Sequence, residues 1–137
     1  MIKSFLLLAS VAVMLSACAS RPRPIAVSPA ERLRCAGVSD SVSKYVSADA
    51  LPFAHLVGTP RVLPVPPALR PGDSITVEFL VLPEGLGDPS SVEINGSSDP
   101  AFARSVLQLV TESSFIPARL TNCNVLSKYS LVIKPAA

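Results

Sequence analysis

The stretch SITVEFLVL, residues 74–82, constrains the fold more strongly than any other part of this sequence. Every second residue from Ile75 to Val81 is apolar, whereas the positions between them include Thr76 and Glu78. Side chains of a β-strand point in turn to opposite faces, so the pattern predicts a strand with one uniformly apolar face. Another element with a matching apolar face is expected to pack against it.

A hairpin and a helix are predicted directly after this strand. The segment PEGLGDP, residues 83–89, has the composition of a turn, and SSVEI, residues 90–94, predicts a second short strand. Asp99 followed by Pro100 predicts a helix start, because the carboxylate accepts orphan amide hydrogens and proline has none to satisfy. The next apolar residues have the spacing of one helical face, which should pack on the hairpin; they are Phe102, Val106, Leu109 and Val110.

A third strand is predicted by NVLSKYSLVI, residues 124–133, after a brief extended crossing that Pro117 imposes. The segments together predict an α+β fold, a small antiparallel three-stranded sheet with one helix packed on it. If the third strand lies at the edge of the sheet, its unpaired amides and carbonyls would accept an added strand. The residues expected to flank the incoming peptide are Ser127, Tyr129 and Leu131. Two alternatives stay open: these residues fill the core, or the region around Cys35 covers the edge.

The N-terminus has the layout of a secretory signal. Lys3 supplies a positive charge, and the apolar run of residues 5–17 is shorter than the roughly 20 residues that a membrane-spanning helix needs. The run ends in LSAC, residues 15–18, which resembles the lipobox of bacterial lipoproteins. The resemblance implies that residues 1–17 are removed and that the thiol of Cys18 carries a lipid anchor with fatty acyl chains such as palmitate. An ordinary cleaved signal with Cys18 unmodified is the alternative.

The residue after Cys18 bears on the destination of the chain. It is Ala19, whereas an Asp at this position commonly retains Gram-negative lipoproteins at the inner membrane. The resemblance therefore implies the periplasmic face of the outer membrane.

Four segments are expected along the chain. Three prolines within residues 19–30 predict an extended tether, and the stretch from Ala19 to Arg34 would reach at most roughly 50 Å. Short helices are expected near residues 30–36 and 40–50. The expected segments are a signal peptide at 1–17, a lipidated tether at 18–34, an N-terminal extension with a proline-rich lead-in at 35–72 and a folded domain at 73–135.

Charge and cysteine content narrow the function. Residues 18–137 hold 11 basic and 10 acidic side chains, which disfavours nucleic acid as a partner because nucleic-acid binders usually carry a clustered basic excess. With Cys18 acylated, Cys35 and Cys123 remain as an even pair in a compartment that permits disulfides. A disulfide between them is expected, and two buried free thiols are the alternative.

The order strand, turn, strand, helix, FIPA and strand resembles the C-terminal domain of the TonB family of periplasmic energy transducers. The similar segment runs from Ile75 to Ile133, and its marks are VEFLVLPEG, the pair Ser97-Ser98 and the aromatic-x-Pro-Ala motif at Phe115. The resemblance implies a final strand whose edge accepts an extended peptide from an outer-membrane transporter.

The sequence is compatible with three functions. The favoured one is a membrane-anchored protein-interaction module that binds an outer-membrane or periplasmic protein by strand addition. The first alternative is a structural or regulatory envelope lipoprotein that forms homodimers through the same edge. The second is a TonB-type energy transducer in transmembrane transport. This alternative is weaker, because a lipobox stands where a transducer has its transmembrane helix.

Catalysis is disfavoured by the scarcity of suitable groups. The one histidine, His55, lies in the mostly apolar context LPFAHLVG. Glu78 and Glu93 would meet across the hairpin, but a solvated outer face explains them as well. No close Cys/His pair and no phosphate-loop pattern occur, so we expect neither a metal nor another cofactor.

Overall fold

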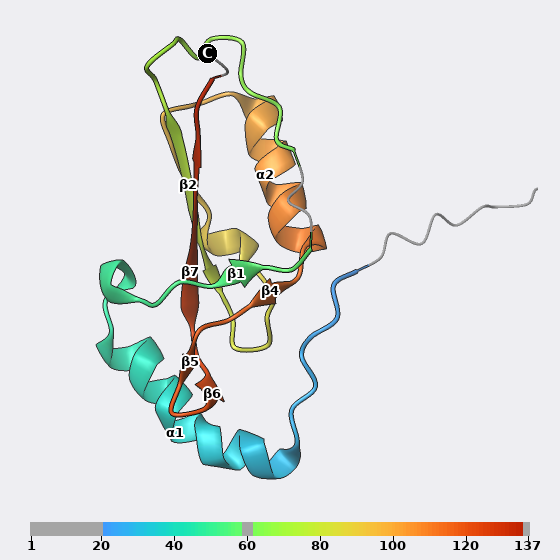
Figure 1. Ribbon diagram of the computed structural model, residues 1–137, viewed down its shortest axis with the longest axis vertical. Coiled ribbons are helices and arrows are strands. Elements are labelled where there is room, and N and C mark those ends of the chain that lie inside the picture. The colour runs from blue at the N-terminus through green and yellow to red at the C-terminus, as the bar shows by residue number, and fades with distance from the viewer. Residues whose placement is uncertain (1–20, 59–61, 136–137) are drawn as a thin grey trace, which may run out of the picture.

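The computed structural model describes residues 21–58 and 62–135 and has an α+β fold (Figure 1). The signal peptide and Cys18 lie outside the described residues. The described residues form the α-helices α1 (Pro29–Tyr45) and α2 (Pro100–Glu112) and the 3-10 helices η1 (Ala48–Ala50) and η2 (Pro89–Ser91). The strands are β1 (His55–Leu56), β2 (Ile75–Val81), β3 (Glu93–Asn95), β4 (Phe115–Ile116), β5 (Arg119–Leu120), β6 (Cys123–Asn124) and β7 (Ser127–Ile133). Neither helix of this described part is long and apolar enough to cross a bilayer.

The central sheet has three antiparallel strands in the order β3-β2-β7. Its longest pairing joins β2 to β7 from Ile75↔Ile133 to Val81↔Ser127. The hairpin partner β3 pairs with the other side of β2, from Thr76↔Asn95 to Glu78↔Glu93. The predicted three-stranded sheet is therefore present, and its last strand lies at one edge.

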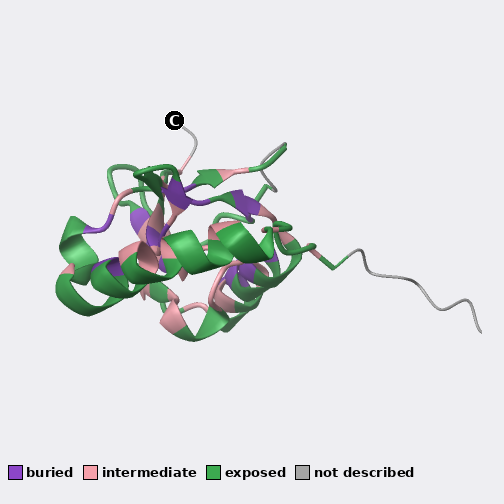
Figure 2. Ribbon diagram, turned by 90° about the horizontal axis from the view of Figure 1, so that it is seen from below, coloured by how far each residue is buried: buried purple, intermediate pink, exposed green. Residues whose placement is uncertain are grey.

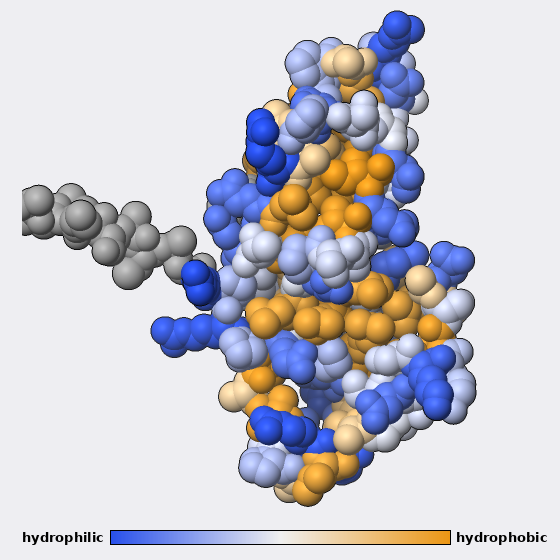
Figure 3. Space-filling model, turned by 180° about the vertical axis from the view of Figure 1, so that it is seen from behind, coloured by the Kyte–Doolittle hydropathy of each residue, from blue (hydrophilic) through white to orange (hydrophobic). Residues whose placement is uncertain are grey.

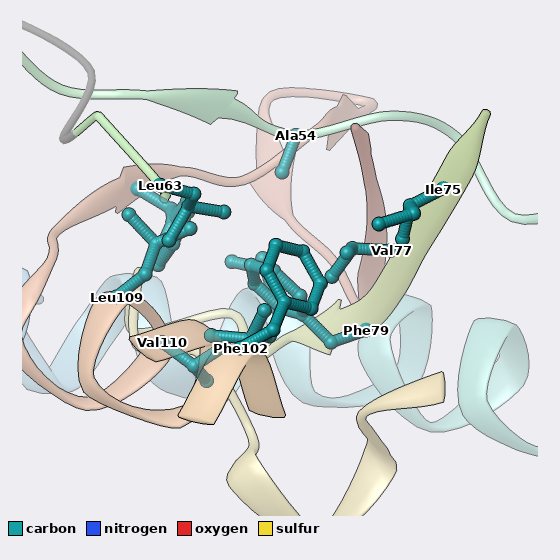
Figure 4. Close-up of a cluster of buried hydrophobic side chains, with 11 residues drawn as sticks. Ala54, Leu63, Ile75, Val77, Phe79, Phe102, Leu109 and Val110 are labelled. Atoms are coloured by element: carbon teal, nitrogen blue, oxygen red, sulfur yellow. The ribbon is translucent and has the colours of Figure 1, made fainter. Parts of the chain in front are cut away.

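Helix α2 covers the apolar face of this sheet, as its spacing predicts. The Asp99 carboxylate caps the helix by accepting a hydrogen bond of 3.0 Å from the Ala101 amide, and Pro100 follows at the first helical position. Figure 4 shows Phe102, Leu109 and Val110 of α2 in one cluster with Val77 and Phe79 of β2. Full burial of each such side chain contributes about 1.5 to 3 kcal/mol, so this layer is the main source of stability.

Two strand boundaries differ from the sequence prediction. The stretch predicted as a strand at 90–94 begins with the 3-10 turn η2, because the Asp88 carboxylate caps the Ser90 amide at 3.0 Å and draws the chain into a turn. The strand predicted at 124–133 begins only at Ser127. Before it, the Val125 amide donates to the Ala118 carbonyl at 3.0 Å, which turns the chain away from β2.

The N-terminal region also differs from the prediction. Two short helices were predicted, near residues 30–36 and 40–50. The structure has one helix of 17 residues, α1, across the first and much of the second, and the 3-10 helix η1 near the end of the second. The helix starts where the Ser28 hydroxyl accepts a hydrogen bond of 3.2 Å from the Glu31 amide, so the extended part of the tether ends before residue 34.

Helix α1 forms a second, smaller core at one end of the sheet. Val42, Leu51 and Val125 are buried there, and Leu80 and Leu126 pack against them. Val42 is the only buried residue of α1, and most of the surface of the helix is exposed (Figure 2). Since so little of α1 is buried, contacts other than apolar packing must hold it in place.

Candidate protein-interaction edge

The outer side of β7 is the candidate site, and a short segment of the chain shows which of its backbone groups face outward. The Lys128 amide donates to the Pro52 carbonyl and the Lys128 carbonyl accepts from the Ala54 amide, both at 2.9 Å. These groups therefore point away from β2. Backbone groups of an antiparallel strand alternate between its two sides, so those of Ser130 and Val132 also point outward.

Ser130 and Val132 form the open part of this edge. In the described chain, β7 pairs only with β2, and the sole bridge on its other side joins Phe53 to Lys128. Both side chains are exposed, Val132 to 54%. In Figure 1 this part of β7 extends beyond the point where the segment leading to β1 crosses it. We call Ser130 and Val132, with their outward amides and carbonyls, the open edge.

The open edge has a mixed polar and apolar outer face. The Lys128 ammonium lies 3.5 Å from the Glu78 carboxylate on the neighbouring strand. The Ser130 hydroxyl donates to the same carboxylate at 3.3 Å. These contacts hold the outer face of β2 and β7 in one arrangement and leave the Val132 side chain beside them unburied.

The residues expected from the sequence to flank a peptide lie on the opposite face of β7. Ser127 is fully buried, and Tyr129 and Leu131 pack against the core under α2. Their backbone groups bond to β2 by the same alternation. The prediction that this strand lies at the edge of the sheet is confirmed. The residues whose amides and carbonyls point outward, however, are Ser130 and Val132.

Ser127 has a structural role at the lower end of β7. Its hydroxyl accepts a hydrogen bond of 2.7 Å from the Ala118 amide and donates one of 2.8 Å to the Val125 carbonyl. A buried hydroxyl with both partners joins the segment after α2 to the start of β7. The sequence gives no sign of this role, because serine at a strand end is equally typical of an exposed position.

Tyr129 belongs to an aromatic cluster in the core. Its ring centroid lies 5.2 Å from that of Phe79 and 5.3 Å from that of Phe115. Burial raises the pKa of the Tyr129 hydroxyl above its usual value of 10.0, because the charged phenolate loses hydration there. The cluster fixes β7 against β2 from the inner face.

The segment that closes the lower end of the edge is held by its own buried residues. Leu51 and Ala54 are 5% exposed and belong to the two different cores, so residues 52–54 are held across β7. Between them, Phe53 stays 60% exposed, with the Lys128 ammonium 5.9 Å from its ring centroid. Neither periodicity nor turn composition marks this crossing in the sequence.

The expected disulfide is present between Cys35 of α1 and Cys123 of β6. The Arg34 guanidinium adds two hydrogen bonds of 3.4 Å to the carbonyls of Thr121 and Asn122. The helix is thereby fastened beside β6, and it is the segment 52–54 that covers the edge at Lys128. The N-terminal region therefore covers the edge of β7 at Lys128 and leaves Ser130 and Val132 uncovered.

The other groups considered from the sequence are not gathered into a site. His55 is exposed on β1 opposite Ile116. Glu78 does lie directly across from Glu93, but it is paired with Lys128. In the parts of the chain that the structure describes, no three His, Cys, Asp or Glu side chains are grouped to hold a metal ion.

Comparison of the chain with protein-family models found no match. Comparisons with curated proteins and with solved structures found none either.

Proposed function

We propose that this protein is a lipid-anchored interaction module of the bacterial cell envelope, which binds an extended segment of a partner protein by strand addition to β7. The observation that carries this proposal is the open edge, where Ser130 and Val132 turn their amides and carbonyls away from β2. Main-chain hydrogen bonds supply affinity in this mode of binding, and side chains beside the added strand supply specificity.

The fold supports the proposed TonB-like character of the domain. The chain order β2, β3, α2, β7 is the order expected from that resemblance, and β7 is an edge strand. We carry over the peptide-binding edge and leave out energy transduction. A lipid anchor at Cys18 would hold the domain at the periplasmic face of the outer membrane, where envelope proteins are the available partners.

Photo-crosslinking in intact cells tests the binding edge directly. A photoreactive amino acid at Val132 should give a crosslinked product that contains a second polypeptide. The matched control is the same amino acid at Leu107, which is 42% exposed on α2 and should give none. A product that contains two copies of this chain would instead support the homodimer. Equal products from both positions, or none from Val132, would contradict binding at this edge.

A pair of proline substitutions tests whether strand addition is the mode of binding. Ser130→Pro removes an outward N–H and leaves the β2–β7 hydrogen bonds intact, which edge strands tolerate. We expect it to abolish the Val132 crosslink while circular dichroism shows a folded chain. Leu131→Pro removes an N–H that points to β2 and should unfold the sheet. An undiminished crosslink in folded Ser130→Pro protein would exclude main-chain pairing there.

The anchor is tested separately by mass spectrometry of the native N-terminus. We expect the mature chain to begin at Cys18 with diacylglycerol on the thiol, and metabolic labelling with an acyl probe to be lost in Cys18→Ser. An unmodified N-terminus would contradict the anchor and leave the binding edge unaffected.

A further inference from the structure

We infer that the start of the described chain lies against an anionic lipid surface. The side chains that make this contact are those of Arg21, Arg23, Arg32 and Leu33. This inference rests on the proposed lipid anchor at Cys18, and it adds an orientation of the domain on the membrane. We call these four residues the basic face.

The positive charge of the chain is concentrated next to the proposed anchor. Residues 21–34 contain four arginines and one acidic residue, Glu31, which gives a net charge of +3. Residues 35–137 contain seven basic and nine acidic side chains, which gives −2. The near-neutral balance of the whole chain therefore hides a strong asymmetry. Basic segments beside a membrane anchor are attracted to anionic headgroups.

Two of the basic side chains extend from the start of the described chain, and the third, Arg32, borders a hollow that Glu31, Asp40 and Glu84 also line. Arg21, Arg23 and Arg32 are exposed, and within the described residues no ion pair involves them. In Figure 3 strongly hydrophilic side chains project where the described chain begins. Arg34 is directed elsewhere, since its guanidinium bonds to the carbonyls of Thr121 and Asn122.

An exposed leucine stands among these charges. Leu33 is 82% exposed on α1, although a leucine on a helix that faces only water gains nothing from its apolar side chain. It lies directly after Arg32 in the sequence, so the two side chains leave the same turn of the helix about 100° apart. Basic side chains around an apolar one are typical of helices that lie in the headgroup region of a bilayer.

The proposed anchor at Cys18 would keep the basic face near the membrane. The Ile25 amide donates to the Glu84 carbonyl at 2.8 Å, so the chain is fixed to the domain from that residue on. The six residues between Cys18 and Ile25 span at most about 25 Å. The first turns of α1 follow immediately, and in Figure 1 the C-terminal end of β7 lies at the opposite end of the molecule. Contact through the basic face would thus leave the open edge pointing away from the lipid.

Tryptophan fluorescence of the full acylated chain tests this orientation. The chain has no tryptophan, so Leu33→Trp provides a single emission signal. In vesicles of phosphatidylethanolamine and phosphatidylglycerol we expect a blue-shifted emission, strong quenching by brominated acyl chains and little quenching by aqueous iodide. The matched control is Val65→Trp, 44% exposed in the loop before β2, for which the two quenchers should act in the opposite order.

A charge-reversal variant and the salt dependence decide whether the basic side chains cause the contact. Replacing Arg21, Arg23 and Arg32 by Glu should make the Leu33→Trp signal as accessible to iodide as the Val65→Trp signal. Added salt or neutral phosphatidylcholine vesicles should act in the same direction, because both weaken attraction to the surface. If Leu33→Trp protein carrying the acyl anchor shows the control behaviour in anionic vesicles, the inference is wrong while the anchor stands. Loss of the anchor itself is read independently from the mass of the N-terminus.

Discussion

At the scale of single residues, the buried hydroxyl of Ser127 is the polar group that most constrains β7. It lies between the Ala118 amide and the Val125 carbonyl and has no exposure to solvent. We predict that Ser127→Ala lowers the free energy of unfolding by about 1 to 3 kcal/mol, because the Ala118 amide and the Val125 carbonyl each lose their hydrogen bond to the buried hydroxyl. Denaturant titration measures this as a lower midpoint.

The control for this prediction lies on the same strand. Ser130→Ala removes a hydroxyl from an exposed position and should change the free energy of unfolding by no more than about 0.5 kcal/mol. If the two alanine variants unfold at the same denaturant concentration, the hydrogen bonds of Ser127 do not stabilise the fold.

Tyr129 gives the stability of the protein a dependence on alkaline pH. Its pKa in the folded state is raised above 10.0, so as the pH rises past that value the unfolded chain loses its proton first. The folded state then binds more protons than the unfolded state, and stability falls with rising pH. Below pH 10 the contribution is fully present, and it is lost as the pH approaches the folded-state pKa.

The two tyrosines of the chain separate this effect from other alkaline titrations. We predict that Tyr129→Phe flattens the fall in stability above pH 10, measured as the urea midpoint at several pH values. Tyr45→Phe, which changes a side chain that is 75% exposed, should keep the slope of the parent protein. An equal slope in all three proteins would assign the effect to other groups.

At the scale of elements, α1 depends on its fastenings more than on its own packing. It buries only Val42, and the disulfide from Cys35 closes a sequence separation of 88 residues. In the chain-entropy model, a closed loop of this size contributes about 4 to 5 kcal/mol. We predict that replacing Cys35 and Cys123 by Ser lowers the unfolding free energy and raises amide hydrogen exchange throughout α1.

The matching expectation concerns α2, whose face is buried in the main core. Its amides from Phe102 to Val110 should keep much more of their protection than those of α1, because the contacts with β2 do not involve the disulfide. Mass spectrometry with peptide resolution distinguishes the two helices. Equal loss of protection in both would mean that α1 and α2 open as one unit.

The elements also differ in how far the sequence predicts them. The alternation in β2 and the Asp99-Pro100 start of α2 are local signals, and both elements occur where they are expected. Helix α1 has almost no apolar face and carries Gly37 in its middle, so a single helix of this length is not foreseeable. Its position is set by the bond between Cys35 and Cys123, which lies far away in the sequence.

The candidate site was predictable in outline and not in detail. A final strand at the sheet edge follows from the order of the elements. The order of the elements does not show which backbone groups of this strand are open. That depends on the crossing of residues 52–54, where Leu51 and Ala54 reach two separate cores. Strands of two residues, such as β1 and β4, carry no periodic signal at all.

At the scale of the whole molecule, the segment that precedes α1 contacts the domain at Ile25. The Ile25 amide bonds to the Glu84 carbonyl, and its side chain lies so close to Gly85 that an added Cβ there would be 3.0 Å from Ile25 Cδ1. Gly85 has φ of +81°, a conformation that glycine adopts without strain. The extended segment before α1 is therefore attached to the domain at Ile25.

This attachment can be removed without touching the domain. We predict that Ile25→Pro, which lacks the N–H, increases the mobility of a spin label at Val65 on vesicle-bound protein, because the tether lengthens. Ala26→Pro is the matched control, since the structure gives the Ala26 amide no backbone hydrogen bond. Equal mobility in the two proline variants would show that the Ile25 contact does not restrain the domain.

The crossing of β7 by residues 52–54 also limits what can be added to the sheet. At the start of β7, pairing is blocked at Lys128, whose outward groups already bond to residues 52 and 54. After the end of β7 comes Pro135, which has no N–H. A guest segment would be confined to a few residues, with no continuous ribbon on which further copies could stack. The crossing that limits the length of an added segment thus also disfavours growth of the sheet into fibrils through this edge.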